Sequence, residues 1–327
     1  MKTLLELTAW VAGTSMAIFD PQTQSHDEQN DGPLWMRQFV LEVGAARSGT
    51  NFLGEVLSQH PHLAYWRRPK YVWRYGNAWK SDDCLTASDA RPPVRRYVRR
   101  RFGEFLKQSG KQRLLVCTQA NSLALDFVNA IFPQGKIVHI IRDGREVAAS
   151  QKQEWQTHNA VFTSKGSRPP FVSLVARRLR EVPLADLPAY LPEFLGTTWT
   201  MLSGSRFRYS MGPKIHNWRQ RAASMDRLAF GALTWRECVT AARDVGRQMS
   251  HGRYYEVKFE DVVSRPEIAV PPLLEFLELP PSREVDEFLA RQVDRSVSGK
   301  WLTRLTPGEL DLIMPIIGDL CRELGYE

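Results

Sequence analysis

A glycine-bounded loop between a buried strand and a helix constrains this chain more than any other sequence feature. An apolar run over Phe39–Val43 predicts the strand, and Asn51–Gln59 reads as the helix that follows. Gly44 and Gly49 bound the loop between them. Glycines at this spacing let successive backbone N–H groups surround a phosphate at a helix N-terminus, where the helix dipole favours negative charge. The segment therefore predicts an anion site at the carboxyl end of a strand.

The residues of this glycine loop (residues 44–51) differ from those of a nucleoside triphosphatase. Such an enzyme ends its loop with Gly-Lys-Ser/Thr, where the lysine contacts the outer phosphates and the hydroxyl binds magnesium. Here Thr50 and Asn51 occupy those two places, and the cation inside the loop is Arg47. The loop argues against ATP hydrolysis and for a phosphate-bearing nucleotide that is bound without a metal ion.

A second motif stands later in the chain. An apolar run over Ile137–Ile141 ends in Arg142, and Ser150 follows on the next expected helix. Together with Gly-x-x-Arg-Ser-Gly-Thr in the glycine loop, this motif resembles the sulfotransferases that use 3′-phosphoadenosine 5′-phosphosulfate (PAPS). The resemblance covers about residues 37–327 and includes the C-terminal Gly299-Lys300-Trp301.

The resemblance implies which residues bind the donor. Arg142 and Ser150 would hold the 3′-phosphate, Lys300 would add a further contact, and no metal ion would take part. The 5′-phosphosulfate would be held by Arg47, Ser48, Gly49, Thr50 and Asn51. Two alternatives stay open: Ser150 could instead bond back to a helix carbonyl, and Lys300 could be an exposed cation beside its tryptophan.

Two groups that the family usually employs in catalysis are missing. Relatives often carry a glutamate base in a pattern like Glu-Pro-Lys-Tyr-x-Trp, and here Arg68 stands at that glutamate. Aligned on Asn121, Cys117 stands where relatives often have a lysine near the transferring group. A guanidinium remains charged at physiological pH and cannot serve as that base. Losing a general base typically costs about 10²- to 10⁴-fold in rate, so the chain requires compensation.

Three hypotheses account for the missing base. Another side chain could serve, with His216, His62 and His158 as candidates. The acceptor could ionise easily, as a phenol or hydroxamate does, or be a nucleophilic amine; Arg67 and Arg68 would then attract an acidic acceptor. The scaffold could also bind a phosphonucleotide yet catalyse a different reaction or none, since a fold does not fix a function.

Strands that alternate with helices predict an α/β fold. We expect a doubly wound parallel sheet of the P-loop, sulfotransferase-like kind, with helices on both faces and the ligand at the carboxyl ends of the strands. The expected strands cover residues 39–43, 114–117, 137–141 and 254–259, and later helices are expected over residues 215–225, 228–249 and 311–324. Residues 1–35 are read as an N-terminal helix and polar linker, and residues 36–327 as the sulfotransferase domain, with an acceptor-side insertion over about 155–215.

Charge alone does not make this a nucleic-acid-binding protein. The formal net charge is +8, and arginines concentrate between Arg91 and Arg101. On a helix many of them would share one side, and only Tyr97 and Phe102 are interleaved as stacking partners. We interpret this segment as a solvated helix face rather than a polyanion site.

Cysteine usage and the N-terminal segment indicate where in the cell the protein is expected. The four cysteines form no Cys-x-x-Cys pair and have no histidine at metal-ligand spacing, so neither a zinc site nor a disulfide framework is expected. The apolar stretch before residue 20 contains Glu6 and is too short to span a bilayer. The sequence therefore predicts a cytoplasmic enzyme. Its expected acceptor is a small molecule, which could be acidic or phenolic, and no nucleic-acid partner is expected. The sequence leaves the oligomeric state open.

Overall fold

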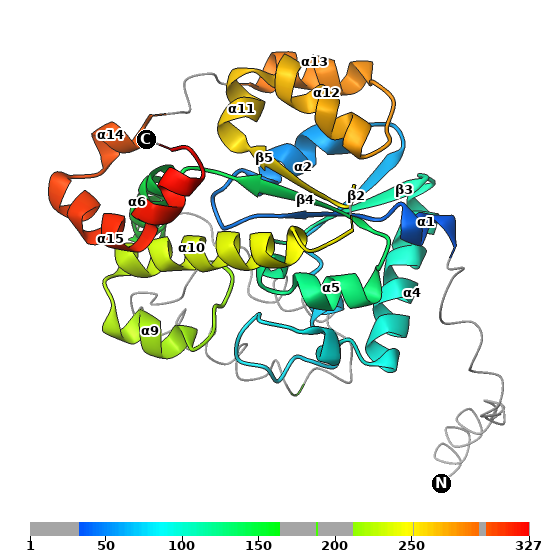
Figure 1. Ribbon diagram of the computed structural model, residues 1–327, viewed down its shortest axis with the longest axis horizontal. Helices are drawn as coiled ribbons and strands as arrows, with labels where there is room; N and C mark the ends of the chain where they lie inside the picture. Colours follow the sequence, from blue (N-terminus) through cyan, green and yellow to red (C-terminus); the bar gives the residue numbers. More distant parts are fainter. Residues whose placement is uncertain (1–32, 164–187, 189–211, 251, 294–298, 327) are drawn as a thin grey trace, which may run out of the picture. The chain divides into compact units, whose positions relative to one another are not determined.

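Five parallel strands form the centre of the fold, in the order β2-β3-β1-β4-β5 (Figure 1). The computed structural model describes residues 33–163, 188, 212–250, 252–293 and 299–326. Residues 34–327 form one compact unit, from which residues 1–33 are separate. The strands are β1 Val40–Val43, β2 Leu63–Arg67, β3 Arg113–Cys117, β4 Lys136–Ile141 and β5 Tyr254–Lys258. The expected N-terminal helix and most of the expected acceptor-side insertion lie outside the described residues.

Helices connect the strands and continue beyond the last of them. Up to β4 the helical segments are α1 Leu34–Arg37, α2 Thr50–Ser58, α3 Lys70–Trp73, η2 Ala87–Asp89, α4 Pro92–Ser109, η3 Gln119–Leu123 and α5 Leu125–Ile131. After β4 they are α6 Gly144–Thr163, α9 Trp218–Ser224, α10 Arg227–Gly246, α11 Phe259–Ser264, α12 Pro266–Phe276, α13 Arg283–Gln292, α14 Trp301–Arg304 and α15 Pro307–Glu323.

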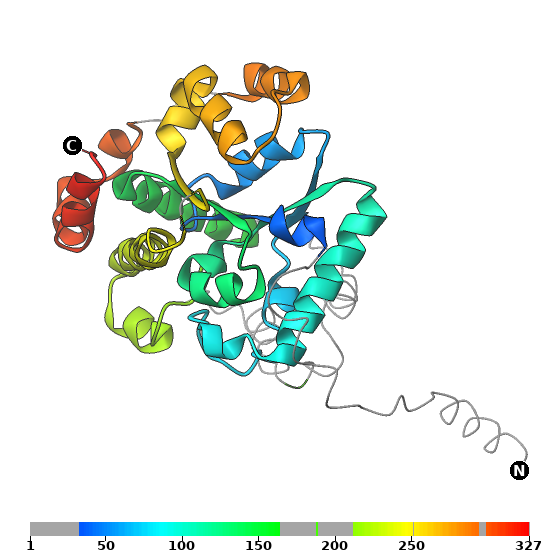
Figure 2. The ribbon, with the colours of Figure 1, turned by 45° about the vertical axis from the view of Figure 1, so that its right-hand side comes forward.

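Helices cover both faces of the sheet, which confirms the doubly wound α/β prediction. Along β1, Val40 packs into a core with α2, α11, α12 and α13, and Leu41 packs into the opposite core with α4 and α5. Figures 1 and 2 show these two helical layers on either side of the strands. Because both faces are covered, the central strands are apolar at nearly every position, as parallel strands usually are.

The strand order indicates that a ligand would bind beside β1 and β4. The chain leaves β1 towards β3 and β2, but it leaves β4 towards β5 on the other side. Ligands of open α/β sheets bind outside the carboxyl ends of two such neighbouring strands. The glycine loop follows β1 and Arg142 follows β4, so both motifs lie at this point.

One strand, β2, was not expected from the sequence, and some element boundaries differ from those expected. β2 is an edge strand whose last three residues are half-buried or exposed, so its apolar signal is weak. The helix expected from Ile215 begins at Trp218, because Asn217 has a left-handed backbone with φ 53° at its N-cap. The last helix begins at Pro307, well before the expected start, because Thr306 and Glu309 form a capping box there.

Candidate functional site

The glycine loop fits closely against its neighbours only because it has two glycines. A Cβ on Gly49, which has φ +94°, would lie 2.2 Å from Cδ2 of Phe259. A Cβ on Gly44 would lie 2.6 Å from the carbonyl oxygen of Ile140 on β4. Between them Arg47 also has a positive φ of 72°. Backbone in this region is strained for a residue other than glycine, so the fold holds the loop in a fixed shape before any ligand binds.

The polar groups of the loop are only partly used within the protein. The amide of Gly44 donates to Oγ of Ser122 at 3.1 Å, and Oγ1 of Thr50 accepts from Nε2 of Gln119 at 2.9 Å. The Ser48 hydroxyl is fully buried and has no hydrogen-bond partner among the residues that the structure describes. Buried polar groups are normally paired. An unpaired hydroxyl in an anion-binding loop fits a site that a ligand completes.

The two sequence motifs meet at Arg47. Its Nε donates to Oγ of Ser150 on α6 at 3.0 Å, and its carbonyl oxygen accepts from Nη1 of Arg142 at 3.2 Å. Its guanidinium also lies 3.5 Å from the Glu154 carboxylate. Three residues predicted to bind the donor, from two distant segments, therefore form one hydrogen-bonded group.

Arg142 is held in place from several sides. Its Nη2 donates to Oε2 of Glu146 at 3.3 Å, and its guanidinium lies 4.5 Å from the ring centroid of Phe259. Burial lowers the pKa of the Arg142 guanidinium, an effect that the Glu146 carboxylate opposes. Its Nε is buried and makes no hydrogen bond within the described part of the chain. The site thus holds a buried guanidinium with an unused donor.

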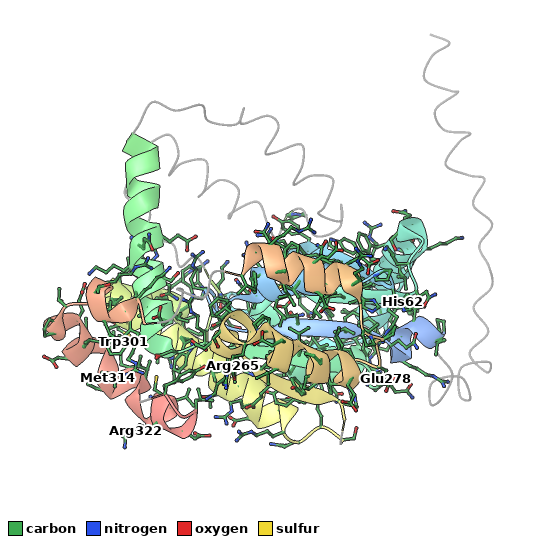
Figure 3. All side chains as sticks on the ribbon, turned by 90° about the horizontal axis from the view of Figure 1, so that it is seen from above. His62, Arg265, Glu278, Trp301, Met314 and Arg322 are labelled. Carbon is green, nitrogen blue, oxygen red and sulfur yellow. The ribbon has the colours of Figure 1, made fainter. Side chains whose placement is uncertain are left out.

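Glu146 also ties the C-terminal segment to this group. Its Oε1 accepts from the backbone amide of Trp301 at 3.2 Å. The Trp301 ring lies 4.3 Å below the Arg145 guanidinium, which is paired with Asp143 at 2.8 Å. Trp301 is labelled in Figure 3 on α14, beside α6. Lys300 directly precedes Trp301 in the sequence. The predicted donor-binding lysine is therefore next to the residue whose amide binds the Glu146 carboxylate.

Arg68 lies on the opposite side of the loop. Its Nη2 donates to Oδ1 of Asn51 at 3.2 Å, and its amide donates to the carbonyl oxygen of Cys117 at 2.9 Å. Its φ of 56° is left-handed. The two positions at which the family's catalytic groups are missing, Arg68 and Cys117, are thus neighbours at the ends of β2 and β3.

Among the described residues, the contacts of His216 and His62 are with residues outside the glycine loop. Nδ1 of His216 lies 3.6 Å from Oδ2 of Asp82, and its side chain is 68% exposed. The segment before it does pass the loop, since a Cβ on Gly212 would lie 3.3 Å from Cβ of Ala46. The amide of His62 donates to the His60 ring. The side chain of His158 lies outside the described residues.

Glu42 is a buried acid that the sequence analysis did not single out. It lies on β1 opposite Cys117 of β3, and both of its oxygens are buried without a hydrogen-bond partner in the described ranges. A Cβ on Gly54 of α2 would lie 2.8 Å from Oε2 of Glu42 and 2.4 Å from the Tyr65 hydroxyl. Burial raises the pKa of Glu42 well above its ordinary value, an effect that the Cys117 thiol only partly opposes.

Glu146 and Glu260 were also missed. Glu146 stands four residues after Arg142, the spacing of an ion pair on one helix, so that contact could have been found from the sequence. Glu260 accepts from the amide of Asp143 at 3.0 Å and from the Tyr326 hydroxyl at 3.0 Å. Burial raises the pKa of Glu260. Its contacts join distant segments, and no local pattern indicates them.

The described residues contain no group of three or more histidine, cysteine, aspartate or glutamate side chains placed to hold a metal ion. Within the same ranges, each helix is too short or too polar to cross a membrane.

Comparisons with known proteins agree with the motifs. Residues 40–182 match the protein-family model described as "Sulfotransferase family". The nodulation protein NoeE of Sinorhizobium fredii is 22% identical over an alignment 331 residues long, which covers 90% of this chain and 67% of NoeE. The match to the family model confirms the resemblance that the motifs predicted.

Solved sulfotransferase structures resemble the chain at low identity. A sulfotransferase domain from the curacin biosynthetic pathway has a TM-score of 0.49 at 13% identity and covers 88% of this chain and 97% of its own. A sulfotransferase domain from the Synechococcus PCC 7002 olefin synthase has a TM-score of 0.47 at 18% identity, and the match covers 88% of this chain and 94% of that domain. Mouse sulfotransferase SULT7A1 complexed with PAP has a TM-score of 0.44 at 13% identity, and the match covers 88% of each chain. These scores lie below 0.5, so the fold assignment rests on the sheet itself.

Proposed function

We propose that the chain is a sulfotransferase, in agreement with the family model matched by residues 40–182, and that it transfers a sulfuryl group from PAPS to a small-molecule acceptor. One observation carries the proposal: Arg47 of the glycine loop joins Ser150 and Arg142 of the second motif in one hydrogen-bonded group. A donor with anionic groups at both ends requires two cationic sites at a fixed separation. The two motifs come from distant segments and end at neighbouring strand tips, which supports this assignment.

In this proposal the glycine loop binds the 5′-phosphosulfate. Its amide groups, the Ser48 hydroxyl and the Arg47 guanidinium supply donors, and Thr50 and Asn51 begin the helix whose dipole favours the negative charge. Arg142 and Ser150 bind the 3′-phosphate, where a planar guanidinium matches two phosphate oxygens. Lys300 adds a further positive charge from the C-terminal segment.

The reaction would rely on positioning and fixed charge. The acceptor atom forms a bond to sulfur while the bond from sulfur to the bridging phosphate oxygen breaks, and 3′-phosphoadenosine 5′-phosphate (PAP) leaves. Negative charge then grows on the bridging oxygen. Arg47 and the amides at the start of α2 would stabilise it without rearranging, because the loop is already held in shape.

Calorimetric titration tests the donor site. PAP should bind the wild-type protein more tightly than adenosine 5′-phosphate, because only PAP has the 3′-phosphate. Arg142→Ala should weaken PAP binding by about 10- to 100-fold, the size of one to two charge-assisted hydrogen bonds, and should leave adenosine 5′-phosphate nearly unaffected. Ser150→Ala should act in the same direction by a smaller factor.

Arg265→Ala is the matched control. Arg265 pairs with Asp261 at 3.1 Å on the surface of α11 and α12, and its side chain is 62% exposed. This variant should bind PAP like the wild type. Equal affinity of the wild type for PAP and adenosine 5′-phosphate would refute the 3′-phosphate site, even if Arg142→Ala proves unstable.

A second candidate function keeps the binding site but not the reaction. Arg68 and Cys117 stand where the family's base and lysine are expected, and this observation favours a diverged protein that binds a phosphonucleotide and catalyses a different reaction or none. Turnover of sulfur-labelled PAPS with a panel of acceptors decides between the two. If Arg68→Glu with Cys117→Lys sulfates acceptors that the natural chain leaves untouched, the ordinary reaction has been lost.

The proposal also includes a reducing compartment such as the cytoplasm. All four cysteines are free thiols, and Cys117, Cys238 and Cys321 are buried. Burial raises the pKa of each of these three thiols, which keeps them protonated and unreactive at neutral pH.

A further inference from the structure

Arg68 occupies a fixed position beside the sulfuryl end of the proposed donor site. β2 ends at Arg67, which is in register with Cys117 of β3, and the chain then turns. Two backbone hydrogen bonds fix the turn: the amide of Arg68 donates to Cys117 at 2.9 Å, and the carbonyl of Arg68 accepts from Lys70 at 2.7 Å. The exposed guanidinium reaches Asn51, the second residue of α2.

The neighbouring arginine has a different partner. Arg67 pairs with Glu55 at 3.6 Å, one helical turn beyond Asn51 on α2. Its charge is therefore balanced by a carboxylate on the surface. The contact of Arg68 with Asn51 is to a neutral amide, and no carboxylate contacts the Arg68 guanidinium among the described residues.

Within the described part of the chain, no carboxylate or imidazole contacts the Arg68 guanidinium. Glu42 is buried beneath α2, and Glu55 is paired with Arg67. The described histidines bond elsewhere: His60 to Pro280 and His62, His139 to Tyr254, and His216 to Asp82. The Glu154 carboxylate lies 3.5 Å from Arg47, on the α6 side of the loop. Among the described residues, the surroundings of Arg68 itself thus combine a cation with no carboxylate or imidazole in contact with it.

We propose that the acceptor attacks as an oxyanion: an acidic hydroxyl, such as that of a phenol, that ionises in solution and is held by Arg68. This inference rests on the proposed function. The proton leaves the acceptor to water before binding, so the step itself needs no base. The anionic oxygen then forms the bond to sulfur as the bond from sulfur to the phosphate oxygen breaks, and PAP departs with the negative charge. Arg68 is a catalytic residue in this scheme because it contacts the attacking oxygen.

The dependence of rate on pH tests the scheme. The acceptors are phenol, with a pKa of about 10, nitro-substituted phenols that are more acidic, and an aliphatic alcohol. With saturating PAPS, kcat/KM for each phenol should rise with pH to a plateau, and the midpoint should follow the pKa of that phenol. The alcohol should not react. A midpoint that stays the same across the series would show that the enzyme supplies a base, and it would overturn the proposal.

Variants separate Arg68 from its surroundings. Arg68→Gln should lower kcat/KM for the phenols on the order of 10²-fold, as removal of one donor to a reacting oxyanion does, with PAP affinity unchanged within about twofold. Arg68→Lys should recover part of the loss. Arg265→Gln, on the surface of α11 and α12, is the control and should behave like the wild type. Unchanged turnover by Arg68→Gln, or an equal loss in both glutamine variants, would overturn the role of Arg68.

The same experiments distinguish a wrong acceptor class from a wrong donor site. PAP binding without turnover of any phenol would refute the acceptor class while leaving the donor site intact. Failure of PAP to bind the wild-type protein would refute the proposed function, and this inference would fall with it.

Discussion

Replacing Glu42 with glutamine should change how the stability of this protein depends on pH. The Glu42 carboxyl is fully buried, and its oxygens have no hydrogen-bond partner among the described residues. The titratable groups beside it are the Cys117 thiol and the Tyr65 hydroxyl, and burial raises the pKa of both. Burial therefore favours the protonated Glu42 carboxyl in the folded chain. Glutamine has nearly the same shape and does not titrate.

The sign follows from the direction of the pKa change. Because the pKa of Glu42 is raised on folding, the folded chain binds a proton that the unfolded chain has released. The free energy of unfolding is then constant below the unfolded value of 4.5 and falls as pH rises from 4.5 towards the folded pKa. The slope for one such group is about 1.4 kcal/mol per pH unit.

His139 contributes a slope of the opposite sign. It is fully buried on β4, and burial, with a smaller effect of Arg243, lowers its pKa from 6.5 to about 3. Below pH 6.5 the unfolded chain binds a proton that the folded chain does not. Stability from this group therefore rises with pH up to 6.5, again by about 1.4 kcal/mol per unit. Above pH 4.5, as far as the folded pKa of Glu42 or pH 6.5, the slopes from Glu42 and His139 should oppose each other.

Urea unfolding at a series of pH values in that window, at constant ionic strength, measures both terms. Relative to the wild type, Glu42→Gln should gain about 1.4 kcal/mol per pH unit as pH rises, and His139→Gln should lose about as much. The double variant should return to the wild-type slope. If the Glu42→Gln and wild-type profiles run parallel, the carboxyl titrates normally when folded, and the argument from its burial is wrong.

Two further predictions concern the glycine loop. Gly49→Ala should destabilise the protein by about 1–3 kcal/mol more than Gly110→Ala, because both have positive φ but only the first meets a phenylalanine ring; equal losses in thermal or urea unfolding would contradict the close packing. Glu154→Gln should tighten PAP binding by up to about fivefold at low salt, because Arg47 loses a competing partner 3.5 Å away and such half-exposed pairs contribute at most about 1 kcal/mol. The control is Glu104→Gln, which removes a surface partner of arginines on α4. If Glu154→Gln instead binds PAP more weakly than the wild type, Glu154 supports the site.

The sequence was sufficient for the local parts of the site. The loop between Gly44 and Gly49 depends on glycine spacing and on the strand and helix beside it, all within residues 40–58. The apolar run that ends at Arg142 is also local. Both signals depend on the conformational freedom of glycine and on the continuous burial of parallel strands, which a short segment expresses by itself.

The missed features have weaker or non-local causes. β2 is an edge strand with a half-buried end, so its residues need not be uniformly apolar. Glu260 and Glu42 have ordinary sequence surroundings, and their burial arises from segments far away in the chain. The role of His216 as a base stays a prediction, and the structure pairs it with Asp82.

The sequence by itself determined that two anion-binding motifs occur and that each ends a parallel strand. Only the tertiary structure decided that Arg47 bonds to Ser150, that Glu146 joins Arg142 to the C-terminal segment, and that Arg68 reaches Asn51. The physical reason is that propensity and burial act along a few neighbouring residues. Contacts between distant residues depend instead on strand order and helix packing, which the whole chain sets together.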